Sequence, residues 1–258
     1  MLAYLAAGAG LGHLTRALAI CLRLRRDAGI DVRIVTDSPF AKGLAGLARF
    51  PFVETSDAAA WVRELKPRVV VTDTFPLVSG STCIHLARRL RRPFTMPHEA
   101  CSLIVELEPL AEDHRAALQE IGCFRVTLNG PVILDPGLIP SRTLPQELDR
   151  DGLTLVVHSG AEDEVRQLVA LAGDGATVIS PWFGSEHFPA SVLYSRARRI
   201  VTGAGYNCMA ELLAHRHKHT AVAFERNYDD QAARLREFFA DPGADGTSQA
   251  VAAILAVA

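Results

Sequence analysis

Short apolar runs alternate with longer stretches of helical periodicity along the chain. In the first half, the apolar runs predict strands at Leu2–Ala7, Asp31–Thr36 and Arg68–Thr72. A helix is predicted over Leu14–Arg26, and a second helical stretch follows Thr36. Strands that alternate with helices are typical of parallel βαβ units. The first half is therefore expected to be a parallel-sheet α/β domain.

The same alternation restarts after residue 150. It predicts strands at Leu153–Val157, Thr177–Ile179, Arg199–Val201 and Thr220–Phe224, and helices at Glu162–Ala172, Asn207–Ala214 and Ala232–Phe239. The restart indicates a second βα domain. The final run, Gln249–Ala258, is apolar and compatible with a helix that packs on either domain.

Turn-forming residues gather between the two halves, in Asn129-Gly130-Pro131, Asp135-Pro136-Gly137 and Ile139-Pro140. This density of glycine and proline favours a linker over a continuous helix or strand. We place the boundary within residues 140–152, which gives an N-terminal domain over 1–145 and a C-terminal domain over 146–258. The expected fold class is α/β, with two Rossmann-like βαβ domains facing a cleft.

Composition and charge narrow the kinds of partner. The 258 residues are 49% hydrophobic, enough for two modest cores, and the net charge is −2. A weakly acidic chain offers no general electrostatic attraction for nucleic acid, so small molecules are the expected partners. The five cysteines are an odd number and form no CxxC pair, which is typical of reduced core residues in a cytoplasmic protein.

The opening apolar run lacks a basic leader and is interrupted by glycines and His13, so it predicts a buried strand and no signal or membrane segment. Arginine runs at 23–26 and 88–92 are each expected at the end of a helix, where cations complement the helix dipole. A peripheral contact with membrane headgroups is left open by these runs and is not implied.

The segment Gly8-Ala9-Gly10-Leu11-Gly12-His13 lies between the first predicted strand and helix, a context in which backbone N–H groups approach phosphate. A tight turn with positive φ explains the glycines without a ligand. The spacing differs from the G-x-G-x-x-G of dinucleotide sites, although Asp31 or Asp37 stands where such a site wants a carboxylate. A nicotinamide enzyme is therefore kept as an outside alternative.

A second glycine turn follows the strand at Arg199–Val201 and opens a helix that carries Glu211. A carboxylate accepts hydrogen bonds from two neighbouring hydroxyls, while N–H groups at a helix start stabilise anionic oxygen. This spacing lets both act on one ligand. The plain alternative is a simple turn followed by an exposed helical glutamate.

Together, GAGLGHLTRALA and the segment from Arg199 to Glu211 resemble the GT-B glycosyltransferases related to the peptidoglycan GlcNAc-transferase, and the UDP-sugar hydrolases of the pseudaminic-acid pathway. The resemblance implies that His13 stands near the anomeric carbon as a general base, which removes a proton from an acceptor hydroxyl or from water. An imidazole suits that task because its ordinary pKa lies near the operating pH.

The resemblance also implies a set of donor-binding residues. They are Gly10 and Gly12 in the first loop, Gly203, Ala204, Gly205 and Asn207 at the diphosphate, Glu211 at the ribose, Asp230 and Gln231 at the sugar hydroxyls, and Phe183 or its neighbour Trp182 at the base. Alternatives remain for two of these groups. Asp-Asp-Gln is an ordinary helix N-cap, and aromatic residues are more often core.

Arg16 and Asp73 are further candidates in the first half. Arg16 lies one helical turn after His13 and either neutralises phosphate or is a solvated helix residue. Asp73 ends a predicted strand, so it either points into the cleft at the carboxyl edge of the sheet or caps the next helix. His98 and Glu99 resemble a His-Glu loop on the acceptor side of the peptidoglycan enzyme, and a local hydrogen-bonded pair is their alternative.

The chain departs from the family pattern in its second glycine loop. That loop is reduced to Val157-His158-Ser159-Gly160-Ala161, followed by acidic residues that would lie poorly beside a diphosphate. Ser159 is either a donor contact or a helix cap. The chain is also shorter than many family transferases, which favours a small acceptor, or water.

No metal or other cofactor is expected. His215, His217 and His219 alternate without an adjacent acidic partner, and no Asp-x-Asp motif stands at a suitable strand end. The leading hypothesis is an inverting, metal-independent transferase that moves a hexose or N-acetylhexosamine from a UDP-sugar to a hydroxyl of a small, lipid or glycan acceptor. The alternatives are a UDP-sugar hydrolase and a nucleotide-sugar-binding protein without turnover.

Overall fold

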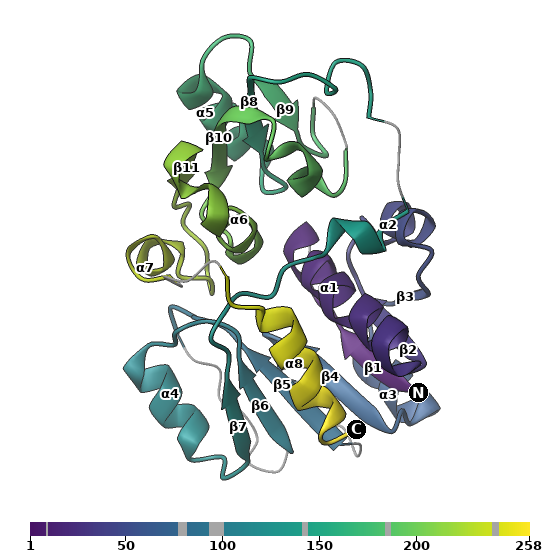
Figure 1. Cartoon of the computed structure of the whole chain (residues 1–258). Coiled ribbons are helices and arrows are strands. Elements are labelled where there is room, and N and C mark those ends of the chain that lie inside the picture. Colours follow the sequence, from purple (N-terminus) through teal and green to yellow (C-terminus); the bar gives the residue numbers. More distant parts are fainter. Residues whose placement is uncertain (9, 77–81, 93–100, 141–143, 184–186, 239–242) are drawn as a thin grey trace. The chain divides into compact units, whose positions relative to one another are not determined.

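The computed structural model of the chain describes residues 1–8, 10–76, 82–92, 101–140, 144–183, 187–238 and 243–258. The chain forms two compact units (Figure 1). Unit 1 contains residues 1–134, 227–230 and 239–258, and unit 2 contains residues 135–226 and 231–238.

Unit 1 is built on a parallel sheet with strand order β3-β2-β1-β4-β5-β6-β7 among the described residues. The strands are β1 Leu2–Leu5, β2 Val32–Thr36, β3 Phe52–Glu54, β4 Val69–Asp73, β5 Thr82–Ala87, β6 Leu103–Glu106 and β7 Phe124–Thr127. The helices are α1 Leu11–Ala28, α2 Ala41–Ala48, α3 Ala58–Leu65, α4 Glu112–Gln119 and α8 Gly246–Leu255. Every residue of β1, β4 and β6 is buried, as expected for parallel strands covered on both faces.

The helix α1 has the predicted arginines in its last turn and ends at a glycine that the sequence analysis did not single out. Gly29 follows it in the left-handed conformation, with φ of 64°, and Arg25 and Arg26 occupy its last turn. The prediction of a helix that ends at the arginine run 88–92 is wrong, because residues 82–87 form β5. Five of its six residues are buried in one continuous run, and so short a run has no periodicity that separates strand from helix.

The C-terminal helix α8 packs on α1 and on the segment after β7, within unit 1. The hydroxyl of Thr247 accepts from the Ile133 N–H at 2.9 Å and donates to the Ile133 carbonyl at 3.0 Å. The Asn129 N–H donates to the Gln249 side chain at 2.8 Å. The division by contacts thus differs from the expected ranges 1–145 and 146–258. Unit 2 starts at residue 135, and the end of the chain joins unit 1.

Unit 2 contains a parallel sheet with strand order β11-β10-β8-β9. Its elements are β8 Leu153–Val157, β9 Thr177–Ile179, β10 Ala197–Gly203, β11 His219–Val222, α5 Glu162–Ala172, α6 Tyr206–Glu211 and α7 Gln231–Arg236. The predictions of β8, α5 and β9 are confirmed with the same bounds. The helix predicted to reach Ala214 ends at Glu211 and continues as a 3-10 segment, Leu213–Lys218.

The described residues contain neither a helix suited to a membrane nor a cluster suited to a metal ion. No helix among them is long and apolar enough to cross a membrane. Within the same residues, no three His, Cys, Asp or Glu side chains gather where they could hold a metal ion.

Candidate functional site

The loop after β1 brings the imidazole of His13 to the carboxyl edge of the unit 1 sheet. Gly10 is the N-cap of α1, so His13 lies in the first turn of the helix. Gly8 has a φ of 129° and donates its N–H to Asp37 Oδ1 at 2.8 Å. A Cβ on Gly8 would lie 3.1 Å from the Cδ2 of His13. A glycine is required there both by the backbone conformation and by the ring beside it.

Beneath His13, Arg16 and Asp73 form a buried ion pair. Arg16 Nε donates to Asp73 Oδ2 at 3.0 Å, and Arg16 Nη2 donates to Oδ1 at 2.7 Å. Both side chains are completely buried. Tyr4 donates its hydroxyl to Asp73 Oδ2 at 3.1 Å, and Thr74 donates to Oδ1 at 2.9 Å. Burial pushes the pKa of Asp73 upward, but the charge of Arg16 and the His13 ring outweigh it and hold that pKa well below its usual range.

The His13 ring is held by this pair through one nitrogen. Its Nδ1 lies 3.2 Å from Arg16 Nη2 and 3.4 Å from Asp73 Oδ1. Burial lowers the pKa of His13, and the opposing effect of Asp73 does not restore it, so the ring is neutral at pH 7. Its Nε2 has no hydrogen-bond partner among the described residues. In the tautomer whose proton lies on Nδ1 and faces Asp73 Oδ1, Nε2 of the neutral ring carries no proton, and this is the arrangement of a general base.

Arg16 is 1% exposed, which shows that its interpretation as a solvated helix residue is wrong. The charge of Arg16 is paired with Asp73. Asp73 caps no helix within the described residues, because its oxygens accept from Tyr4, Arg16 and Thr74. The candidates His98 and Glu99 lie outside the described residues.

Tyr4 is a member of this cluster that sequence reasoning did not single out. It lies in the middle of an apolar strand and is 0% exposed. The sequence offers only a general reason to expect a role for Tyr4, because a buried tyrosine hydroxyl usually finds a hydrogen-bond partner. The partner itself follows only from the fold, because β1 pairs with β4 and Asp73 is 69 residues away in sequence.

In unit 2, the carboxyl ends of β8 and β10 meet at His158 and Gly203. His158 Nε2 lies 2.8 Å from Glu164 Oε2, and its ring lies 5.3 Å from that of Phe224. A Cβ on Gly203 would lie 2.6 Å from His158 Cε1. The glycine at this strand end thus allows the imidazole to pack directly against the backbone.

Arg226 offsets the negative charge of Glu164, one of the acidic residues that follow the shortened glycine loop. Arg226 donates to both carboxylate oxygens of Glu164, with Nη2 at 2.6 Å from Oε2. Burial raises the pKa of Glu164, but the lowering by Arg226 and His158 is larger. The net pKa is below its ordinary value, so the carboxylate is charged. Glu164 Oε2 also accepts from the Ala161 N–H at 3.2 Å, at the start of α5. The interpretation of Ser159 as the helix cap is therefore wrong.

The turn between β10 and α6 places the candidates from Gly203 to Glu211. Gly205 is the N-cap of α6 and Asn207 lies in its first turn. The Ala204 N–H donates to the Val222 carbonyl at 2.7 Å, so this donor is already used inside unit 2. Glu211 accepts from the Tyr194 hydroxyl at 3.1 Å, and burial raises its pKa to about 7. Glu211 is therefore a half-buried carboxyl that titrates near neutral pH.

The remaining donor-side candidates differ in burial and in their contacts. Gln231 is buried, and its Oε1 accepts from the Phe224 N–H at 3.0 Å, which closes the loop after β11. Phe183 is half-buried with the Arg166 guanidinium 5.3 Å from its ring centroid. Trp182 is 53% exposed, so its interpretation as a core residue is wrong. Asp230 is half-buried.

No family model and no curated protein matches the chain. Several solved structures share its fold. SnogD, a glycosyltransferase from Streptomyces nogalater, is 14% identical with a TM-score of 0.53, covering 100% of this chain and 99% of its own. The spinosyn rhamnosyltransferase SpnG is 13% identical with a TM-score of 0.57, and the match covers 100% of this chain and 91% of SpnG.

A third likeness is to a UDP-GlcNAc 2-epimerase from Methanocaldococcus jannaschii, with 10% identity, a TM-score of 0.52 and full coverage of both chains. At such identities the likeness concerns the fold. It confirms the predicted class of two Rossmann-like α/β domains, as in GT-B glycosyltransferases. It does not single out the peptidoglycan enzyme or the pseudaminic-acid hydrolase among proteins of this fold.

Proposed function

We propose that the chain is an inverting, metal-independent glycosyltransferase that moves a hexose or N-acetylhexosamine from a UDP-sugar to an acceptor hydroxyl. The observation that carries the proposal is His13, a neutral imidazole held at Nδ1 by a buried Arg16–Asp73 pair. The GT-B-like fold supports it, because glycosyltransferases are among the proteins with this fold. The five free cysteines suit the cytoplasm, where we place the protein.

In the proposed reaction, His13 Nε2 takes the proton of the acceptor hydroxyl. The acceptor oxygen forms a bond to the anomeric carbon of the sugar while the bond from that carbon to the diphosphate oxygen breaks, and UDP departs. The Nδ1–H of the resulting imidazolium points to Asp73, whose charge stabilises it. Asp73 remains ionised because Arg16 holds its pKa low, so it accepts no proton itself.

The structure modifies the role proposed for Arg16. Its guanidinium makes a two-point contact with Asp73 and lies 3.2 Å from His13 Nδ1. A cation that is fully buried in such a pair is a poor phosphate contact, because freeing it would leave Asp73 uncompensated. We therefore assign Arg16 to positioning His13 and Asp73.

On the donor side, we assign the diphosphate to the turn that contains Gly203, Gly205 and Asn207, and the ribose to Glu211. The Ala204 N–H bonds Val222 and is removed from this set. Glu211 accepts a bond from the Tyr194 hydroxyl, and a carboxylate has room for further hydroxyl donors. Gln231, Asp230, Phe183, Ser159, Gly10 and Gly12 keep their expected donor contacts as part of the proposal.

A product assay tests the proposed function. The protein is incubated with UDP-glucose and UDP-GlcNAc, with and without a panel of sugar, lipid and small-molecule alcohols, and UDP, free sugar and glycoside are quantified. We expect UDP release that depends on the acceptor and matches glycoside formed. His13→Gln should lower turnover by about 10²–10⁴-fold with unchanged UDP affinity, since general base catalysis contributes that much. Full turnover by His13→Gln would exclude its role as base.

Two alternative activities use the same site. With water as the acceptor, the chain would be a UDP-sugar hydrolase, and UDP and free sugar would appear together without an added alcohol. The fold of a UDP-GlcNAc 2-epimerase also superposes over the whole chain, so the assay includes detection of epimerised UDP-sugar. Tight UDP-sugar binding with no product of any kind would identify a binding protein without turnover.

A further inference from the structure

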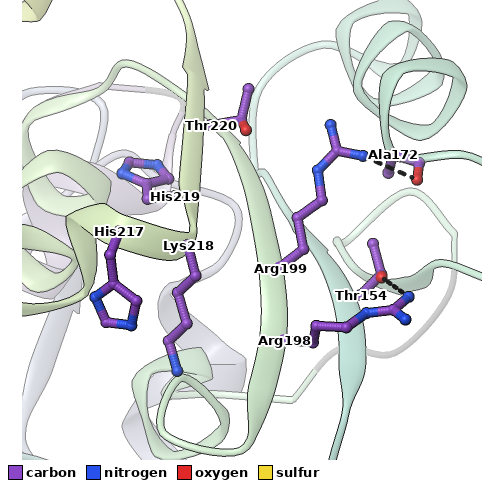
Figure 2. A pocket seen from close by; sticks show the side chains of 8 residues that line it. All are labelled: Thr154, Ala172, Arg198, Arg199, His217, Lys218, His219 and Thr220. Carbon is purple, nitrogen blue, oxygen red and sulfur yellow. Dashed lines mark hydrogen bonds between the residues drawn. The ribbon is translucent and has the colours of Figure 1, made fainter.

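A second candidate site lies at the opposite edge of the unit 2 sheet. A pocket of about 470 Å³ opens near the amino ends of β8, β10 and β11 (Figure 2). Thr154, Arg199 and Thr220 contribute to it from these three strands, and Ala172 contributes from the end of α5. The residues proposed to bind a donor, Gly203 to Glu211, begin where β10 ends, so this pocket is separate from them.

Three cationic side chains line the pocket, and no carboxylate does among the residues that the structure describes. Arg198, Arg199 and Lys218 all line it. Their hydrogen-bond partners among the described residues are neutral oxygens. Arg198 Nη2 donates to Thr154 Oγ1 at 3.3 Å and Arg199 Nη1 to the Ala172 carbonyl at 3.4 Å. Lys218 Nζ donates to the Ser195 and Ala197 carbonyls at 3.2 and 2.9 Å.

These bonds leave donors on the two guanidinium groups. Each guanidinium has five N–H groups, and the single bond that each one makes within the described structure is long. None of the three cations forms an ion pair with a described Asp or Glu. Positive charge is therefore concentrated in a concave site without a counter-charge, which favours an anionic ligand.

A β-bulge brings the two neighbouring arginines to one pocket. Along β10, Ala197 pairs with Leu153 and Arg199 pairs with Thr154, so Arg198 is an extra residue between consecutive pairs. In a regular strand, adjacent side chains point to opposite faces. The bulge breaks this alternation, and both Arg198 and Arg199 line the pocket beside Thr154.

The histidine at the start of β11 adds no charge. His219 Nε2 lies 2.8 Å from Thr202 Oγ1, and burial lowers its pKa to about 4, so it is neutral at pH 7. The positive charge of the pocket therefore comes from Arg198, Arg199 and Lys218. The hydroxyls of Thr154 and Thr220 supply neutral polar groups beside them.

We propose that this pocket binds the phosphate group of a phosphorylated ligand, through Arg198, Arg199 and Lys218. Arginine matches phosphate because its planar fork donates two parallel bonds to two oxygens. Lysine adds a compact third charge. A phosphate in this position is supplied either by a small phosphate ester in solution or by the headgroup of an acidic phospholipid. The inference does not rest on the proposed glycosyl transfer.

Calorimetric titration of the full chain with inorganic pyrophosphate tests the site. The double variant Arg198→Gln/Arg199→Gln should lose at least about tenfold in affinity, because each arginine makes charge-assisted bonds. The matched control is Arg63→Gln/Arg236→Gln, which removes two exposed positive charges that do not line the pocket and should bind within about twofold of wild type, because salt screens interactions with exposed charges outside a site. Arg198→Gln alone is the second variant, because its exposed side chain makes one long bond and its loss leaves the fold intact.

UDP titration of the same variants separates this site from the donor site. We expect the double variant to bind UDP as wild type does, whatever the outcome of the product assay. The inference is overturned if wild type binds no pyrophosphate, if both pocket variants bind it unchanged, or if the control loses as much affinity as the double variant. Co-sedimentation with vesicles of phosphatidylcholine, with and without phosphatidic acid, then separates the sources. Retention on acidic vesicles that depends on the arginines supports the headgroup, and pyrophosphate binding without retention supports the soluble ester.

Discussion

Arg16 lowers the pKa of two neighbouring side chains, Asp73 and His13, and so favours the charged form of one and the neutral form of the other. It keeps Asp73 ionised, and it also lowers the pKa of His13 together with burial. The two effects cooperate in the proposed mechanism, since a general base must be neutral and its partner carboxylate must be charged. Tyr4 adds a neutral donor that helps to satisfy the buried carboxylate without adding charge.

The first prediction concerns the stability of this cluster. Asp73→Asn leaves Arg16 buried without its counter-charge and should lower the free energy of unfolding by about 3–5 kcal/mol, measured by urea denaturation. Asp27→Asn is the matched control, because Asp27 pairs with Arg23 and Arg26 on the surface of α1, where the effect should be much smaller. Equal losses in the two variants would contradict a tightly coupled buried pair.

The second prediction concerns Glu211 and pH. Burial raises its pKa from 4.5 to about 7, so the folded state resists its ionisation. Its contribution to stability is complete below about pH 4.5 and is lost as the pH rises through about 7, a difference of about 3 kcal/mol. Unfolding of wild type and Glu211→Gln should therefore be compared between pH 4 and pH 8, roughly. The wild type should lose stability relative to the variant over this interval.

The same titration affects the proposed ribose contact. Hydroxyl donors favour the charged carboxylate, so a bound ribose lowers the pKa of Glu211. UDP-sugar affinity should therefore increase as the pH rises from about 6 to about 8, and Glu211→Gln should remove the increase. A pH dependence that persists in the variant would assign it to another group.

At the level of elements, the two glycines of the turn from β10 to α6 have very different surroundings. Gly203 packs against the His158 ring, whereas nothing lies within 4 Å of a Cβ built on Gly205. The first glycine is required by packing. The second lies at the N-cap of α6 with a φ of −65°, which any residue adopts.

The third prediction follows from this difference. Gly203→Ala should lower the free energy of unfolding by about 1–3 kcal/mol, because the added methyl would displace His158. Gly205→Ala should change it little, since the weaker N-cap is offset by the reduced entropy of the unfolded chain. Thermal unfolding of both variants checks this expectation, and equal effects would refute the packing argument.

The elements that the sequence pattern predicted well are those with strong local signals. β8, α5 and β9 have the predicted bounds because apolar runs and polar helix faces alternate clearly there. β5 was mistaken for a helix because its buried residues are continuous. The partners of Glu164 could not be predicted either, because Arg226 is 62 residues away and the two meet only through the order of the strands.

Across the whole molecule, the sequence pattern predicted the two parallel-sheet units and the segment that holds His13. It did not predict that the C-terminal helix completes unit 1. An apolar run such as Gln249–Ala258 fits any uncovered surface. Its place is fixed by specific contacts, among them Thr247 with Ile133 and Ser248 with Arg23.

The fourth prediction concerns the contact between α8 and Ile133. Thr247→Val removes the hydroxyl that bonds both backbone groups of Ile133, and leaving the Ile133 N–H without this partner should cost about 1–3 kcal/mol. Thr247→Ser keeps the hydroxyl and is the matched control. Hydrogen exchange should show weaker protection in β7 and α1 for the valine variant, with unit 2 unchanged. Uniform loss of protection in both units would contradict a local role.

The insertion of unit 2 into the sequence of unit 1 has a consequence for synthesis on the ribosome. The strands β8 to β11 emerge before α8, so unit 2 can finish its sheet while α1 still lacks the helix that packs on it. Domains generally fold as units as they are made. Here the unit begun first is completed after unit 2, and its nascent form keeps part of the α1 surface open to chaperones until α8 has emerged.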